Sequence, residues 1–327
     1  MRRSRMLALG ASLLVLFGAC TTGGGSPTPT STSPGASTSP ATATATPTTG
    51  PPPTIRIGSA GFYESQLLAE MYAQMLEAHG YTVERHLGLG ERPVNEPAFE
   101  SGQIDLKPEY LGGYVEFLNK GKGEATADSA ATATKLQGYL TPLNATLLGY
   151  TPGEDKDGFA VTRETAEAHS LTDMSSLAPV AGQLILGTAP ACVTNPLCID
   201  GLKRVYGITF KEVKTLGACS PDGVTALVNK VIQVYQVCTT QPGVVQFDLV
   251  VLADDKGLQP AQNVAPVVRD DYLAKLPDAD GFKVLLNQVS AGLDTATLLA
   301  LGVKIDIEKQ DIDKVAKDWL TSRGLIP

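Results

Sequence analysis

The chain has 327 residues, 43% of them hydrophobic, which is enough for two ordinary domains with apolar cores. It carries 26 Lys and Arg against 34 Asp and Glu, a net charge of −8. This acidic balance, with no basic stripe or aromatic RNA motif, excludes nucleic acid as an expected partner.

Residues 1–20 have the parts of an export signal. Arg2, Arg3 and Arg5 precede an apolar run from Met6 to Phe17, which is shorter than the ~20 residues that span a bilayer. The following LFGAC resembles the bacterial lipobox, although the residue three before the cysteine departs from the usual pattern. The resemblance implies a diacylglyceryl group on Cys20 and an extracytoplasmic protein anchored to the cell membrane. Plain secretion is the alternative.

Residues 21–53 contain only Thr, Ser, Pro, Gly and Ala. A segment without charge or large apolar side chains buries too little surface to offset the entropy of ordering. We therefore expect a disordered tether between the membrane anchor and the folded part.

Beyond Cys20 there are four cysteines, an even number that indicates two disulfides in an exported chain. Three pairings are possible, and we favour Cys192 with Cys198 and Cys219 with Cys238. The first pair closes a short loop, and the second ties a glycine-containing loop to a strand. A zinc site is a weaker alternative, because the spacing is not CxxC and no histidine lies nearby.

The folded chain opens with alternating strands and helices, which predict a parallel sheet with crossovers. Apolar residues between Glu64 and His79 recur on one helical face, and Gly80 ends that helix. The expected elements are strands 55–60, 82–89 and 104–106, and helices 64–79, 96–101, about 109–119 and 129–144.

A second alternation begins at Asp157. We expect strands at 157–162, 184–187, 212–216, 231–237 and 247–252, and helices at 163–169, 200–206 and 221–229. A further strand ends the segment LQPAQNVAPVV, and the last helix is 311–322 with Asp311 as its cap. Two α/β units joined by more than one crossing segment would form a ligand cleft between them.

The stretch GQIDLKPEYLGGY predicts a strand that turns into a helix near Pro108. Glu109 and Tyr110 would then lie in the first helical turn, at a polar rim where a small ligand can dock. The alternative is that Tyr110 packs in the core and Glu109 is only a helix-terminal charge.

Motifs of catalysis are missing from the sequence. The histidines, His79, His86 and His169, lie in no metal or catalytic motif, and there is no GxSxG, P-loop, SxxK or GxGxxG after a strand. We therefore expect neither an enzyme nor a metal or other cofactor.

One long stretch resembles the opening of the osmoprotectant-type substrate-binding proteins of ABC importers, which bind glycine betaine, choline and related quaternary amines. It reads IRIGSAGFYESQLLAEMYAQMLEAHGYTVERHLGLGERPVNEPAFESGQIDLKPEYLGGYVEFL. The similarity continues through DGFAVTRETA, LCIDGLKRVYG, VCTTQPGVVQFDLVVLADDKGLQPAQNVAPVVR and VAKDWL. It implies an α/β periplasmic-binding-protein-like fold of type II, with two lobes, two crossing segments and a ligand cleft. Lobe 1 would comprise residues 54–156 and 259–327, and lobe 2 residues 157–258.

The resemblance also implies site residues. Binders of this family surround the trimethylammonium group with tyrosines, because ring faces hold a cation that donates no hydrogen bonds. Tyr110 matches the tyrosine of the family's PEYTG motif, and Phe159 stands where another box tyrosine is usual. Cys238 and Gln241 replace the tyrosine and aspartate of the YTTD motif, whereas Thr239 persists. Further expected cleft residues are Tyr63, Arg92, Glu109, Asp157 and Tyr235.

The carboxylate side of the family's site departs from the pattern. Ala60, Gly113 and Asn195 stand where betaine binders have lysine, threonine and arginine, so Asn195 would contact only a polar part of the solute. We expect a monomeric, lipid-anchored protein that delivers a small cationic or zwitterionic solute to an ABC permease and its ATPase. The alternatives are a different amine or an aromatic betaine as ligand, or a surface sensor that does not serve transport.

Overall fold

The computed structural model describes residues 50–193 and 195–327, which belong to one compact unit. The expected signal peptide with Cys20, and the tether up to residue 49, lie outside the described residues. Among the described residues no single helix has the length and hydropathy to cross a membrane. The helices Ala279–Ala291 and Thr295–Ile307, which are bent relative to each other, reach that length and hydropathy only when they are counted together.

Two five-stranded sheets organise the described chain, and each is the centre of one lobe. The first sheet has the order β2-β1-β3-β10-β4, with β1 (Ile55–Gly58), β2 (Val83–His86), β3 (Leu106–Tyr110), β4 (Ala145–Leu147) and β10 (Val264–Arg269). The second has the order β7-β6-β8-β5-β9, with β5 (Asp157–Thr162), β6 (Ile185–Thr188), β7 (Glu212–Thr215), β8 (Val234–Cys238) and β9 (Leu249–Leu252). The lobe boundaries expected from the sequence stay a prediction.

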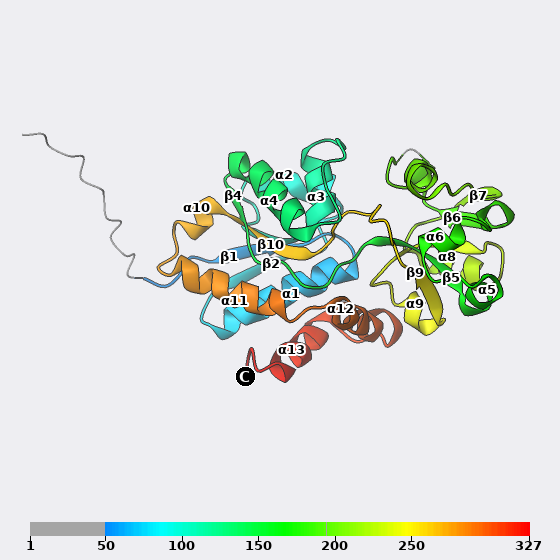
Figure 1. Cartoon of the computed structure of the whole chain (residues 1–327). Coiled ribbons are helices and arrows are strands. Elements are labelled where there is room, and N and C mark those ends of the chain that lie inside the picture. The colour runs from blue at the N-terminus through cyan, green and yellow to red at the C-terminus, as the bar shows by residue number, and fades with distance from the viewer. Residues whose placement is uncertain (1–49, 194) are drawn as a thin grey trace, which may run out of the picture. The chain divides into compact units, whose positions relative to one another are not determined.

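Helices cover both faces of the first sheet. Figure 1 shows α3 and α4 on one side of it and α1 and α11 on the other. The bounds are α1 (Tyr63–Ala78), α2 (Arg92–Glu100), α3 (Leu111–Leu118), α4 (Ser129–Leu140), α10 (Asp270–Leu273), α11 (Ala279–Ala291), α12 (Thr295–Gly302) and α13 (Ile312–Ser322). One apolar cluster packs α1, α11 and α13 against the sheet, and a second packs α2, α3 and α4 against its other face.

The second sheet is covered in the same way by shorter helices. These are α5 (Arg163–His169), α6 (Met174–Leu177), α7 (Ile199–Gly201), α8 (Pro221–Val228) and α9 (Gly243–Gln246). The chain after α7 continues through a wider helical turn, Leu202–Tyr206, and that after α12 through another, Val303–Ile307. Two separate apolar clusters bury the two faces of this sheet.

The structure corrects two expectations about the sheets. Both are mixed rather than parallel, because β10 runs antiparallel to β3 and β4, and β5 runs antiparallel to β8 and β9. The physical reason is the double crossing: β4 leads out of the first lobe and β10 leads back into it, so they run in opposite directions. The strand β4 was not expected: it directly follows the expected helix 129–144, of which α4 occupies only the part up to Leu140.

The helix expected near Pro108 is also corrected. Pro108, Glu109 and Tyr110 are the last residues of β3, and α3 starts at Leu111. Pro108 is opposite Pro266 in the antiparallel pairing with β10. A residue before a proline favours extended backbone, which explains why the strand continues through this segment.

The two crossing segments lie side by side. Glu154 and Asn263 form an antiparallel bridge, and the amide of Asp155 donates to the carbonyl of Gln262 at 3.2 Å. Thr151 lies inside this pairing, and its hydroxyl accepts from the amide of Val264 at 2.9 Å. The connection between the lobes is therefore a short hydrogen-bonded ribbon.

Candidate functional site

A cavity of about 650 Å³ is lined by residues of both lobes. Such a volume lies in the range of small-molecule sites. Its lining residues are Phe62, Tyr63, Glu91, Ala218, Cys219, Pro221, Val224, Thr225, Cys238, Thr240, Gln241, Pro242, Gly243, Gln246, Phe247, Asp306 and Ile307. We call this space the interlobe cavity.

Aromatic rings reach the interlobe cavity from both lobes. Phe62 immediately precedes α1 and is 38% exposed, and Phe247 immediately follows α9 and is 43% exposed. Large apolar side chains with so much free surface are available to a ligand. The ring of Phe62 also lies 5.9 Å from that of Tyr110, centroid to centroid.

A hydrogen bond joins the lobes at the edge of the interlobe cavity. The hydroxyl of Tyr63, in the first turn of α1, donates to the carbonyl of Thr240 in the second lobe at 3.1 Å. Burial and the nearby carboxylates of Glu64, Asp155 and Asp306 raise the pKa of Tyr63, so the hydroxyl keeps its proton. Because Tyr63 and Thr240 lie on different lobes, relative motion of the lobes alters this contact.

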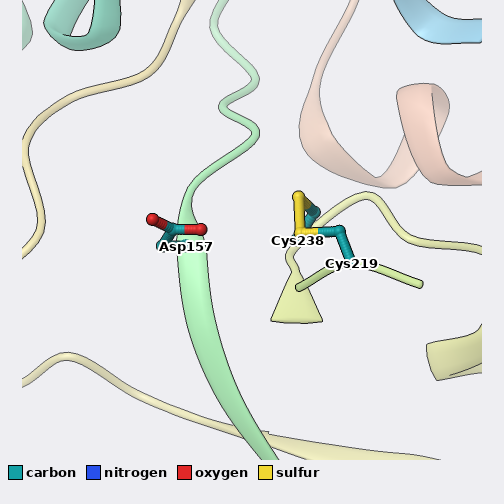
Figure 2. A group of neighbouring side chains, drawn as sticks. All are labelled: Asp157, Cys219 and Cys238. Atoms are coloured by element: carbon teal, nitrogen blue, oxygen red, sulfur yellow. A yellow bond between two sulfur atoms is a disulfide. The ribbon is translucent and has the colours of Figure 1, made fainter. Parts of the chain in front are cut away.

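The disulfides follow the pairing favoured from the sequence, Cys192 with Cys198 and Cys219 with Cys238. The second one forms part of the wall of the interlobe cavity. Figure 2 shows Asp157 beside it, and the sulfur and carboxylate atoms of the three residues lie within 4.8 Å of one another. Metals bind thiolates, so the oxidised pair does not supply ligands for a metal here.

Two carboxyl groups, the buried Glu64 and the half-buried Asp155, lie behind the interlobe cavity. The Tyr110 hydroxyl donates to Oε1 of Glu64 at 2.6 Å, and the amide of Thr240 donates to Asp155 at 3.1 Å. Burial, and the presence of Asp155, raise the pKa of Glu64 to about 8, and burial raises that of Asp155 to about 6. Oε2 of Glu64 has no hydrogen-bond partner among the described residues.

A family model described as the substrate binding domain of an ABC-type glycine betaine transport system matches residues 53–322. The chain belongs to this family. It is therefore a substrate-binding component of an ABC-type transport system and not an enzyme. Binding proteins of ABC importers act on the extracytoplasmic side of the membrane.

Relatives and solved structures agree with the family. A glycine-betaine-binding protein of Pseudomonas aeruginosa is 30% identical over 286 residues, which cover 84% of this chain and 89% of that protein. The glycine betaine-binding protein YehZ of Escherichia coli is 28% identical, and the aligned residues cover 83% of this chain and 90% of YehZ. A glycine betaine/carnitine/choline ABC transporter structure and apo YehZ superpose with TM-scores of 0.74 and 0.70, at 21% and 25% identity. Each superposition covers 83% of this chain and 99% of the other.

Two residues expected at the ligand site of this binding protein, Tyr63 and Gln241, line the interlobe cavity. Tyr110 lies behind Phe62 instead: its side chain is 8% exposed and belongs to the core cluster of α1. Its ring therefore supports the cavity wall rather than forming it.

Glu109 of β3 and Arg92 of α2 form an ion pair. Arg92 Nε donates to Glu109 at 2.8 Å, and Lys107 Nζ lies 3.1 Å from the same carboxylate. Although burial opposes it, these two cations lower the pKa of Glu109. Glu109 is thus a strand residue in an internal ion-pair network, neither a helix-terminal charge nor a free one.

The remaining expected residues lie in three other places. Phe159 and Tyr235 are buried in the two cores of the second lobe, at 2% and 0% exposure. The hydroxyl of Thr239 accepts from the amide of Lys156, in the first crossing segment. Asp157 and Asn195 line a separate cavity of about 200 Å³, together with Gly113.

Phe62, Phe247 and Glu64 are the residues that the sequence reasoning missed. Phe62 and Glu64 flank Tyr63, which was expected, so the order of aromatic and acidic residues at the start of α1 was an available signal. Phe247 had no local signal, because it reaches the interlobe cavity only through the packing of α9 against β9.

The raised carboxyl pKa values predict that unfolding free energy falls with rising pH. Below about pH 4 these groups are protonated in both states. From about pH 4 up to about pH 6 for Asp155, and up to about pH 8 for Glu64, only the unfolded chain releases the proton freely. Within its window, each group lowers the free energy of unfolding by up to about 1.4 kcal/mol per pH unit. We expect Glu64→Gln to flatten the decline measured by urea unfolding at pH 4.5, 6 and 8. The matched surface change Glu164→Gln should leave the slope unchanged, and an unaltered slope in Glu64→Gln contradicts the assignment.

Proposed function

We propose that this chain captures a small organic cation or zwitterion of the quaternary-amine class in the interlobe cavity and delivers it to an ABC permease and its ATPase. The observation that carries the proposal is the cavity itself, which has a solute-sized volume and exposed rings from both lobes. Ring faces attract an alkylated ammonium group, which loses few hydrogen bonds on leaving water. A solute that touches both lobes stabilises their closed arrangement, which a permease can recognise.

The names of relatives support this class of solute. Besides the two glycine betaine binders, a relative from Listeria monocytogenes, 24% identical, is named a carnitine transport binding protein. We further propose that the chain is exported, anchored through a lipid on Cys20, and works as a monomer. Labelling with a palmitate analogue should then disappear in Cys20→Ala, and labelling that persists contradicts the anchor.

Calorimetric titration of the full chain with quaternary amines and proteinogenic amino acids tests the proposed function. We expect saturable binding of at least one quaternary amine at a ratio of one per chain, and weaker or no binding of amino acids. Uptake of the same solute should depend on the neighbouring permease. Binding of amino acids alone contradicts the proposal.

A further inference from the structure

The two disulfides differ in what can reach them. Cys192 and Cys198 are 2% and 3% exposed and belong to an apolar core of the second lobe. Cys219 and Cys238 are half-buried, and both line the interlobe cavity. Thiol–disulfide exchange requires that an attacking thiolate reaches a sulfur atom. A thiol small enough to enter the interlobe cavity therefore meets the second disulfide, whereas protein covers the first.

The charges beside this disulfide decide which thiols can approach. Figure 2 shows the carboxyl group of Asp157 next to the two sulfur atoms, and Asp157 pairs with Cys238 across β5 and β8. Burial raises the pKa of Asp157, which lessens its repulsion of an incoming thiolate. Of the acidic lining residues, Asp306 is paired with Lys309, and Glu91 remains. A neutral or positively charged thiol is therefore favoured over an anionic one.

One end of the disulfide holds part of the cavity wall in an unusual backbone conformation. Cys219 has a φ of 51°, in the left-handed region that residues other than glycine rarely adopt. Ala218 and Pro221, on either side of it, also line the interlobe cavity. The bond to Cys238 holds Cys219 in this place, so breaking the bond allows this wall to move.

The other end of the disulfide leads directly to the contact between the lobes. Cys238 is the last residue of β8. The amide of Thr239 donates to the carbonyl of Lys156, in the first crossing segment, at 2.9 Å. The carbonyl of Thr240 accepts from the hydroxyl of Tyr63, in the first lobe, at 3.1 Å. The disulfide thus ties the cavity wall to the segment that joins the lobes.

Opening this disulfide leaves the loop around Cys219 attached to its lobe. The hydroxyl of Tyr235 donates to the carbonyl of Gly217 at 2.5 Å and accepts from the amide of Ser220 at 2.8 Å. These two contacts lie on either side of Cys219 and do not involve its sulfur. The effect of opening is therefore confined to the cavity wall and does not amount to unfolding of the lobe.

We propose that the Cys219–Cys238 disulfide is a modification site for low-molecular-weight thiols, which enter the interlobe cavity, exchange with it and thereby weaken solute capture. The incoming thiolate forms a bond to one sulfur of the pair, and the bond between the two cysteines breaks. The second sulfur leaves as a thiolate and takes up the proton that the incoming thiol released. One disulfide replaces another, so the step needs no oxidant, and attack by the freed cysteine reverses it. The effect on solute capture rests on the proposed function.

The reaction itself can be tested without a solute. The full chain is incubated with 2-mercaptoethanol, free cysteines are trapped with N-ethylmaleimide, and the labelled peptides are quantified by mass spectrometry over time. We expect Cys219 and Cys238 to be modified at least about tenfold faster than Cys192 and Cys198, because only the first pair is accessible. Equal rates, or faster modification of the buried pair, overturn the proposal.

The coupling to solute capture is tested by linkage. Calorimetry of the modified chain should show about tenfold weaker binding of the tightest quaternary amine, and that amine at saturation should lower the equilibrium yield of mixed disulfide by the same factor. Cys219→Ser with Cys238→Ser should also weaken binding, and the control, Cys192→Ala with Cys198→Ala, should not. Circular dichroism checks that the variants fold, and the wild-type measurements decide the matter where one does not.

The outcomes separate this inference from the proposed function. Selective modification in a chain that binds no quaternary amine supports the thiol site but removes the proposed function. A chain that binds the amine equally well before and after modification, with no protection by the amine, overturns the coupling and leaves the proposed function intact.

Discussion

Replacing Lys107 with methionine should lower the free energy of unfolding by about 3 to 5 kcal/mol, because it removes the cation from a buried ion-pair network. Lys107 is 1% exposed, and its Nζ lies 2.5 Å from Glu96 and 3.1 Å from Glu109. The same nitrogen lies over the rings of Phe99 and Tyr114, 5.1 and 4.5 Å from their centroids. Without it, the carboxylate of Glu96 stays buried with no opposite charge. Urea unfolding monitored by circular dichroism measures the loss.

Two further variants separate the buried charge from loss of packing. Lys107→Met combined with Glu96→Gln removes both members of the pair and should recover part of the lost stability. Lys230→Met breaks an exposed ion pair with Glu164 and should cost less than about 1 kcal/mol. A loss below 1 kcal/mol in Lys107→Met would show that the network contributes little.

Truncating the exposed rings of the interlobe cavity should have the largest effect on solute affinity. We expect Phe62→Ala and Phe247→Ala each to weaken binding of the tightest quaternary amine about tenfold, because a ring face with its burial is worth more than ~1.4 kcal/mol. The two rings come from different lobes, so the double variant should lose about a hundredfold if their contributions add. Calorimetric titration measures all three dissociation constants.

Both positions tolerate truncation better than core positions do, because each ring is more than a third exposed. Val284→Ala, at an exposed position of α11, is the matched control and should leave affinity unchanged. Changes below twofold in both single variants contradict a binding role for the rings.

The fold was largely accessible from the sequence, because the alternation of apolar strands with amphipathic helices is a local property. The helical face from Leu67 to Leu76, for example, is buried in α1 as its spacing predicts. Strand direction was not accessible, since it depends on where the chain re-enters the first lobe at β10. The proline of PEY was misread as a helix start because Pro108 fits an antiparallel strand pair equally well.

The candidate site was less accessible, because a cavity is assembled from distant segments. Tyr63 and Gln241 were expected and line it, but Tyr110 packs one layer behind, covered by Phe62. The side chain of Phe159 packs in the core of the second lobe and does not line the interlobe cavity. Motif matching gives the position of a ring along the chain, whereas the pleat of the strand decides which way it points.

The most direct test of the account is a crystal structure of the full chain grown with the tightest-binding solute of the titration panel. We predict electron density for that solute between Phe62 and Phe247, in contact with both lobes. Density confined to the smaller cavity beside Asn195, or to the outer surface of one lobe, would contradict the account.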